Sequence, residues 1–144
     1  MLVDNELLFS DAQAVTAAAA STNSIDLGSP RDIGTGENLY LVVVVKAAMT
    51  DAGSDSSVTV ALEGDSTTTF TPDATEDVLS IPAGSAVGDV FYVRLNPGSA
   101  PLQYQYVQLR YTPQNGDLTT GAFTAFITHD IQKFVPYPKG YTIS

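Results

Sequence analysis

The sequence predicts an all-β fold, a jelly-roll-like antiparallel β-sandwich of about eight strands with extended N- and C-terminal segments. Glycine and proline, with 11 and 8 residues, interrupt the chain at short intervals. The runs between them are rich in Val, Thr, Tyr and Phe and are roughly five to nine residues long, as short antiparallel strands are. This spacing leaves little room for the helices of βαβ units, and the uneven loops favour a two-sheet sandwich over a small closed barrel.

The first part of the chain offers one candidate helix and two strands. Residues 12–20 are rich in alanine, whose propensity would allow a helix. Val15 and Thr16 interrupt this run, so we favour an extended segment of small residues. Strands are expected at residues 23–27 and 39–45. Because residues 39–45 have no polar face apart from the Tyr40 hydroxyl, this strand must be covered on both sides.

Alternation of side chains predicts the strands of the middle of the chain. Residues 58–63 and 91–96 each present one apolar face for a core and one polar face for solvent. Shorter strands are expected at residues 67–71 and 77–81.

Two further strands are predicted at residues 103–111 and 123–128. In the first, the apolar side changes near Tyr106, which favours a β-bulge there or a strand covered by different partners at its two ends. The pair Asn115-Gly116 lies between the strands and is typical of a tight turn with positive φ. The two strands are therefore expected to be neighbours joined by this turn.

The length of 144 residues is typical of one domain that buries a core without disulfides. We expect an N-terminal arm at residues 1–12, the sandwich at residues 13–131 and a C-terminal tail at residues 132–144. No internal repeat of fixed period is present in the sequence.

The charge balance disfavours several partners. Sixteen acids against six bases give a net charge of -10, whereas binding to nucleic acid or to an anionic membrane draws on Lys and Arg. The first ten residues contain acids and no base, unlike a secretory signal, and no apolar run approaches the roughly 18 residues of a membrane span. The chain has no cysteine, which excludes a disulfide scaffold, a thiol nucleophile and a thiolate zinc site. We expect a soluble protein suited to a reducing cytosol.

Catalytic and metal-binding patterns are sparse. His129 is the only histidine, so sites that need two imidazoles are excluded, and we expect it to be a surface residue at a strand end. Most acids fall in turn-like contexts, which disfavours a paired-carboxylate glycosidase. Asp51, Asp55 and the neighbouring serines offer oxygen ligands for calcium but lack the spacing of an EF-hand. The sequence therefore predicts no catalytic residue, no cofactor and no metal site.

Contact surfaces are the remaining functional candidates. Residues 2–9 hold five large apolar side chains, too many for a segment exposed to water. Residues 134–141 combine two prolines, which favour an extended form, with two tyrosines that can anchor at an interface. Each segment could cover its own sandwich or reach a neighbouring subunit. The candidate interface residues are Leu7, Leu8, Phe9, Tyr40, Val42, Val44, Phe134, Tyr137 and Tyr141.

Both ends of the chain carry a resemblance. Residues 4–16 (DNELLFSDAQAVT) and 21–28 (STNSIDLG) resemble the start of the capsid cement proteins of tailed phages, the family typified by the cement protein of a Bordetella phage. The late segment THDIQ at residues 128–132, leading to YPKGY at residues 137–141, is compatible with that family. The opening is the more specific part of the resemblance.

The resemblance implies a jelly-roll protein without catalytic residues that forms a small homo-oligomer, a dimer or a trimer. Its partner would be the major capsid protein. The cement protein would bind the outer surface of the capsid shell and stabilise the shell against internal DNA pressure, and the virion would be assembled in the bacterial cytoplasm. A carbohydrate-binding, lectin-like β-sandwich is the alternative, because the fold alone does not choose between these roles. The absence of tryptophan, a common platform for sugars, weighs against that alternative.

Overall fold

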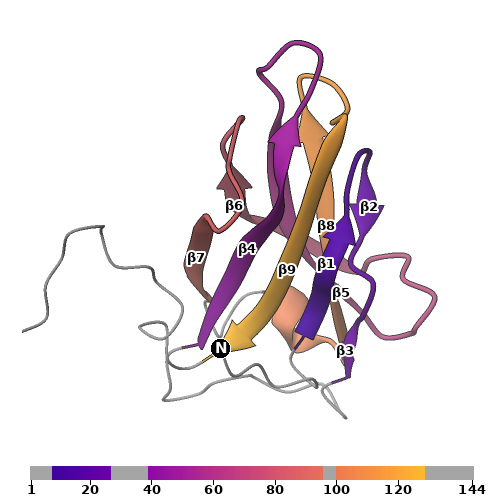
Figure 1. The fold of residues 1–144 in the computed structure, drawn as a ribbon. Coiled ribbons are helices and arrows are strands. Elements are labelled where there is room, and N and C mark those ends of the chain that lie inside the picture. The colour runs from indigo at the N-terminus through magenta and orange to yellow at the C-terminus, as the bar shows by residue number, and fades with distance from the viewer. Residues whose placement is uncertain (1–7, 27–38, 96–99, 129–144) are drawn as a thin grey trace, which may run out of the picture.

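The computed structural model describes residues 8–26, 39–95 and 100–128, and over these ranges the fold is all-β, as the sequence predicts (Figure 1). A 3₁₀ turn, η2 (Ala100–Gln103), precedes the last two strands. Over the same ranges, no helix has the length and apolar character needed to cross a bilayer. The strands are β1 (Leu8–Ala14), β2 (Ala19–Ala20), β3 (Ile25–Asp26), β4 (Leu39–Thr50), β5 (Ser57–Asp65), β6 (Ala74–Ile81), β7 (Val90–Leu95), β8 (Tyr106–Gln114) and β9 (Thr120–Thr128).

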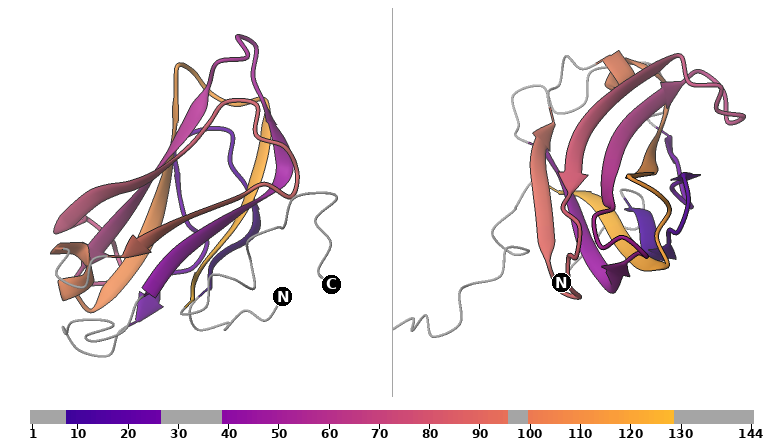
Figure 2. Two further views of the ribbon diagram at one scale, coloured as in Figure 1. Left: turned by 90° about the vertical axis from the view of Figure 1, so that its left-hand side faces the viewer. Right: turned by 90° about the horizontal axis from the view of Figure 1, so that it is seen from above.

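The strands form two antiparallel sheets that pack face to face (Figures 1 and 2). The first sheet has the order β1-β9-β4-β7, and the second has the order β2-β8-β5-β6 with β3 also paired to β8. When β2 and β3 are taken as two pieces of one edge strand, this is the strand order of an eight-stranded jelly roll. The predicted β-sandwich is therefore confirmed.

The hydrophobic core lies between the sheets and takes side chains from both. Tyr111 of β8 stacks on Phe123 of β9, with ring centroids 5.5 Å apart, so the largest buried rings join the two layers. Phe9 of β1 is fully buried in the same core. Alternate residues of the central strands complete it, namely Leu41, Val43, Val45, Val58, Val60 and Leu62.

The alanine-rich segment is extended, so the helical alternative is wrong and the extended alternative is confirmed. Residues 8–12, which we expected in an N-terminal arm, belong to β1 and pair with β9. Ala12 has a φ of 50° and coincides with a shift in the β1–β9 register. Beyond β1, the Val15 amide donates to the Gly121 carbonyl at 3.0 Å and continues the contact between the two segments.

The predicted strand at residues 67–71 is wrong, because this segment lies in the loop between β5 and β6. The amide and hydroxyl of Thr67 both donate to Oδ1 of Asp65, and Phe70 has a φ of 44°. The Ser66 amide donates to the Asp73 carboxylate at 3.3 Å. Such local side-chain acceptors compete with a strand ladder for the backbone donors, and here they stabilise the loop.

Asn115 and Gly116 have the predicted positive φ values, 68° and 114°, but the predicted hairpin is wrong. Strand β8 pairs with β5, while β9 pairs with β4 and β1, so the connection at residues 115–119 crosses from one sheet to the other. Leu118 anchors this crossing: its side chain is buried, and its amide donates to the Thr16 carbonyl at 2.8 Å.

Of the two causes considered for the change of side near Tyr106, the β-bulge is wrong. Strand β8 begins at Tyr106, and its register with β5 runs without a shift from the Asp65–Tyr106 pair to the Ser57–Gln114 pair. The apolar side changes there because the residues before Tyr106 belong to η2 and the turn after it.

Candidate interaction surface

A row of large side chains crosses the outer face of the first sheet from one edge to the other. In the strand registers, Leu8 of β1 lies opposite Phe126 of β9, Phe126 opposite Val42 of β4, and Val42 opposite Tyr92 of β7. Residues directly opposite each other in antiparallel strands point to the same face, so these four form one continuous line. We call Leu8, Phe126, Val42 and Tyr92 the apolar row.

The centre of the apolar row is buried and its β7 end is open. Val42 and Phe126 have no exposed surface, and with Val44 they form a hydrophobic cluster separate from the main core. Leu8 and Val90 pack against this cluster. Strand β4 is therefore buried on both faces, as the sequence predicts for residues 39–45.

The open end of the row combines aromatic and basic side chains. Tyr92 is 48% exposed, and its ring meets that of Tyr40 edge-to-face with centroids 6.4 Å apart. Arg94 lies opposite Tyr40 in the register and is exposed, and it forms no ion pair with any residue that the structure describes. Tyrosine and arginine are, with tryptophan, the residue types enriched among energetic hot spots of protein interfaces.

The predicted interface residues are only partly brought together. Val42 and Val44 lie in the outer cluster, while Tyr40 and Leu8 are half-buried beside it. Phe9 points the other way, into the main core, so its side chain is occupied within the fold. Four more candidates fall outside the described residues, as does the histidine: Leu7, Phe134, Tyr137, Tyr141 and His129.

Sequence reasoning missed Tyr92 as a contact candidate. The alternation of residues 91–96 correctly assigned Tyr92 to the solvent side of the strand. This assignment was the only sign in the sequence that Tyr92 is a contact candidate. A single exposed aromatic side chain is common on protein surfaces, so Tyr92 marks a contact surface only through its place at the end of the apolar row.

The described segments all end at one end of the sandwich (Figure 1). There Leu39 pairs with Leu95, Tyr40 pairs with Thr128, and Asp26 pairs with Tyr106. The chain therefore joins residues 1–7, 27–38, 96–99 and 129–144 to the sandwich at this end, which we call the terminal end. Strands β1 and β9, which lead to the N- and C-terminal segments of the chain, carry Leu8 and Phe126 of the apolar row.

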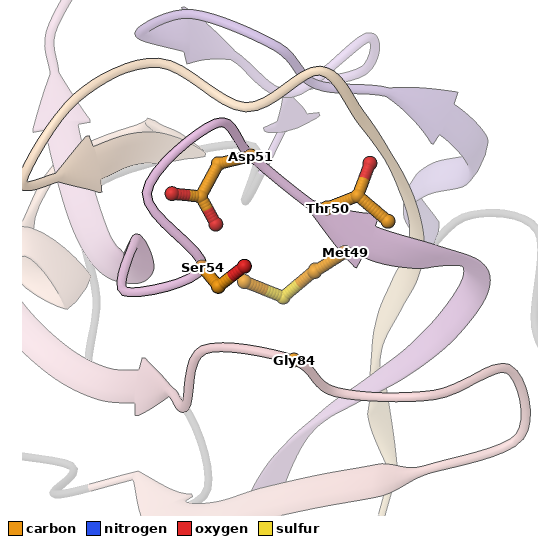
Figure 3. A pocket seen from close by; sticks show the side chains of 5 residues that line it. All are labelled: Met49, Thr50, Asp51, Ser54 and Gly84. Atoms are coloured by element: carbon orange, nitrogen blue, oxygen red, sulfur yellow. The ribbon is translucent and has the colours of Figure 1, made fainter.

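The opposite end, which we call the tip, holds a small cavity of about 120 Å³ (Figure 3). Met49, Thr50, Asp51, Ser54 and Gly84 line it, so it lies between the β4–β5 loop and the β6–β7 loop. Pockets that enclose drug-sized ligands usually measure roughly 300 Å³ or more. The tip cavity is thus too small to enclose a sugar chain.

Asp51 organises the β4–β5 turn at the tip. Its Oδ2 accepts hydrogen bonds from the Gly53 amide, the Asp55 amide and the Ser56 hydroxyl, at 3.2, 3.2 and 3.0 Å. Desolvation raises the pKa of Asp51, but these hydrogen bonds outweigh it and hold the pKa below its usual value of 3.8. Over the described ranges, no group of three or more His, Cys, Asp or Glu residues could hold a metal ion.

The outer face of the second sheet is polar, but part of it is buried. We expected the polar side of residues 58–63 to face solvent, and for Ala61 and Glu63 this is wrong, since they are buried, with Glu63 only 3% exposed. Its Oε1 accepts from Nε2 of Gln108 at 2.8 Å, and its Oε2 pairs with Nε of Arg110 at 3.0 Å. These neighbours on β8 satisfy the carboxylate and explain its burial. The two outer faces thus differ, one apolar and one polar.

A family model described as Bbp16 matches residues 9–127, which run from β1 to the last residues of β9. No curated protein matches the chain. The family match therefore spans every strand of both sheets.

Proposed function

Because the chain belongs to the Bbp16 family, named after a protein of a Bordetella phage, we propose that it is a capsid cement or decoration subunit. Family membership indicates a phage structural protein. The finer proposal is that the chain binds the outer surface of the major capsid protein shell and stabilises it. The observation that carries this proposal is the family match over both sheets, together with the resemblance of the N-terminal sequence to cement proteins.

The distribution of apolar surface supports the proposal. The apolar row ends in the exposed Tyr92, and the strands that carry Leu8 and Phe126 of this row, β1 and β9, begin and end at the terminal end. We propose that the terminal end contacts the shell and the tip faces away from it. On a lattice of identical sites, many copies of a modest interface of this kind add up to a stable coat.

The charge supports a protein partner over nucleic acid. A net charge of -10 keeps the free subunit soluble before assembly and repels the phosphates of packaged DNA. We propose no catalytic activity, no cofactor and no membrane partner, and a location on the outside of virions assembled in the bacterial cytoplasm.

Carbohydrate binding is the alternative function. Jelly rolls host lectins, and Tyr40 and Tyr92 beside Arg94 offer aromatic rings on which a sugar can stack. The tip cavity is too small to enclose a sugar chain, which weighs against this alternative. A glycan array with and without EDTA distinguishes the two functions, since a calcium-dependent hit favours the lectin.

Co-sedimentation with shells that lack the subunit tests the proposal. We expect the full chain to pellet with its cognate shell at micromolar concentration and to saturate at a fixed number of copies. A variant without residues 1–7 keeps all of β1 and serves as the test of the terminal end, with its fold checked by circular dichroism. Lack of binding by the full chain to its cognate shell at micromolar concentration would overturn the proposal.

A further inference from the structure

The connection between β8 and β9 at the tip carries an asparagine followed by glycine, Asn115-Gly116 (Figure 1). The other asparagines of the sequence are followed by Glu, Ser, Leu or Pro. This difference matters because the backbone nitrogen of the following residue is a nucleophile that can attack the asparagine side chain. A side chain on the following residue shields that nitrogen, and glycine has none.

The fold leaves the Gly116 nitrogen open to solvent. Apart from its chain neighbours, a Cβ added at Gly116 would meet a single atom of the described residues within 4 Å, the Ser56 hydroxyl oxygen at 3.9 Å. Asn115 and Gly116 are both exposed, and their φ values of 68° and 114° place the pair in the left-handed region. Solvent therefore reaches both the nitrogen and the amide carbon that it would attack.

Backbone hydrogen bonds hold the second half of this connection but not the first. The Leu118 amide donates to the Thr16 carbonyl at 2.8 Å. The Thr119 amide donates to the Thr50 carbonyl at 2.7 Å. The Gly116 amide, in contrast, donates no hydrogen bond to any residue that the structure describes. Its proton can therefore be lost to solvent without breaking a bond of the fold.

The Asn115 side chain is restrained by one exposed hydrogen bond. Its Nδ2 donates to the Asp55 carbonyl at 3.2 Å. A single hydrogen bond that competes with water contributes little net stability, so it restrains the carboxamide only weakly. The side chain can therefore turn its Cγ towards the Gly116 nitrogen.

From these observations we infer that Asn115 is a site of spontaneous deamidation in the folded protein. The Gly116 nitrogen loses its proton and forms a bond to Cγ of Asn115. The bond between Cγ and Nδ2 breaks, and Nδ2 leaves as ammonia with the proton that the nitrogen gave up. Water then opens the resulting five-membered succinimide at either of its two carbonyl carbons, which yields aspartate or isoaspartate. Water is the only co-reactant, and no electron donor or acceptor is needed.

Both products change the chemistry of the tip. A carboxylate replaces the Nδ2 donor, so the hydrogen bond to the Asp55 carbonyl is lost and two acceptors face each other. The new negative charge lies near two exposed acids in sequence and space, Asp55 and Asp117. Isoaspartate also lengthens the main chain by one carbon just before the buried Leu118. The modified protein is therefore expected to unfold at a lower temperature than the unmodified protein.

Peptide mapping by mass spectrometry tests the inference on the isolated full chain, so its outcome is independent of shell binding. After incubation of the folded protein, the Asn115 peptide is expected to gain the mass difference between an amide and an acid. Separate aspartate and isoaspartate peptides are expected, and the rate is expected to rise with pH because the deprotonated nitrogen attacks. Asn23 is the internal control, since it is exposed but precedes Ser24, and it is expected to react more slowly.

Two variants and the denatured chain complete the test. Asn115→Gln would need a larger ring and is expected to keep its amide, while Gly116→Ala shields the nitrogen and is expected to slow the reaction at Asn115. The wild-type chain in urea at the same pH shows whether the fold protects the site. Reaction at Asn115 in urea but not in the folded protein overturns the inference. A rate at Asn115 in the folded protein no higher than that at Asn23 also overturns it.

Discussion

The hydroxyl groups of Ser10 and Tyr111 lie 2.8 Å apart in the buried space between the two sheets, joining β1 to β8. Burial raises the pKa of Tyr111 to about 12, and the hydrogen bond to Ser10 opposes only part of that rise. In the unfolded chain the same phenol titrates near pH 10. Because the pKa is higher in the folded state, Tyr111 stabilises the fold below pH 10, and this contribution is lost between about pH 10 and pH 12.

We therefore predict that Tyr111→Phe makes the protein less sensitive to alkali. At neutral pH the change removes one hydrogen bond and costs about 1 kcal/mol, since the Ser10 hydroxyl keeps its bond to Gln13. The wild-type protein is expected to lose about 2–3 kcal/mol more than the variant on going from pH 8 to pH 12. Urea unfolding of both proteins across this range checks the prediction, and parallel curves would contradict it.

The opposite sign is expected for Asp51 at low pH. Its folded-state pKa is lowered, so its hydrogen bonds stabilise the fold above the usual value of 3.8, and this contribution is lost as the pH falls through the folded-state pKa. Asp51→Asn is expected to be less stable than the wild type at pH 6 and to approach it below pH 4. Thermal unfolding from pH 6 to pH 2.5 measures the difference. Asp55→Asn is the control and is expected not to show this pH dependence, since the Asp55 carboxylate accepts none of these three hydrogen bonds.

The buried carboxylate of Glu63 predicts an order of effects among its partners. Gln108→Leu leaves Oε1 of Glu63 without its buried donor and is expected to cost about 1–3 kcal/mol. Arg110→Met is expected to cost less, about 1 kcal/mol, because the Arg110 side chain is 38% exposed and the ion pair is screened by solvent. Denaturant unfolding of the two variants and of the double variant measures both costs and their coupling. An equal or reversed order would contradict this account of the site.

Gly64 of β5 predicts a packing effect. A Cβ added at this position would lie 2.3 Å from the Pro101 carbonyl oxygen of η2, so the backbone must shift to accept Gly64→Ala. We expect a loss of about 3 kcal/mol or more. Gly84→Ala is the matched control, since its Cβ meets nothing within 4 Å and only its φ of 74° is strained. That variant is expected to lose about 1–2 kcal/mol.

Two N-terminal deletions distinguish the contribution of residues 1–7 to stability from that of β1. Deletion of residues 1–10 removes Phe9 from the core and is expected to cost about 3–5 kcal/mol. Deletion of residues 1–7 leaves β1 whole. A loss of stability in this variant would mean that residues 1–7 cover the outer cluster around Val42. Thermal unfolding of both variants by circular dichroism checks this, and equal losses would contradict the assignment of Phe9 to the core.

Alternation predicted most of the strands, because burial on one face of a sheet selects apolar side chains at every second position. Alternation failed where backbone groups form hydrogen bonds outside a strand ladder, because it gives no information about such bonds. Thr67 donates to Asp65 within its own loop, and Leu118 is buried in a crossing that the turn signal of Asn115 alone could not distinguish from a hairpin. The first outcome depends on a local side-chain acceptor, and the second depends on which distant segment packs against Leu118.

Only part of the contact surface could be predicted from the sequence, because the rest depends on how the strands are arranged. The two-sided burial of residues 39–45 could be read from the lack of a polar face. Leu8 and Phe9 were both predicted as contact residues, although consecutive residues of a strand point to opposite faces, and in β1 Phe9 enters the core while Leu8 stays with the outer row. The importance of Tyr92 depends on its position at the border of the sheet, which requires the strand order.

The proposed role as a capsid cement subunit is tested most directly by an electron cryomicroscopy map of the phage particle that encodes this chain. We predict density for the jelly roll on the outer surface of the major capsid protein shell, with the terminal end towards the shell and the tip towards solvent. A complete map in which the outer surface carries no such density would contradict the account.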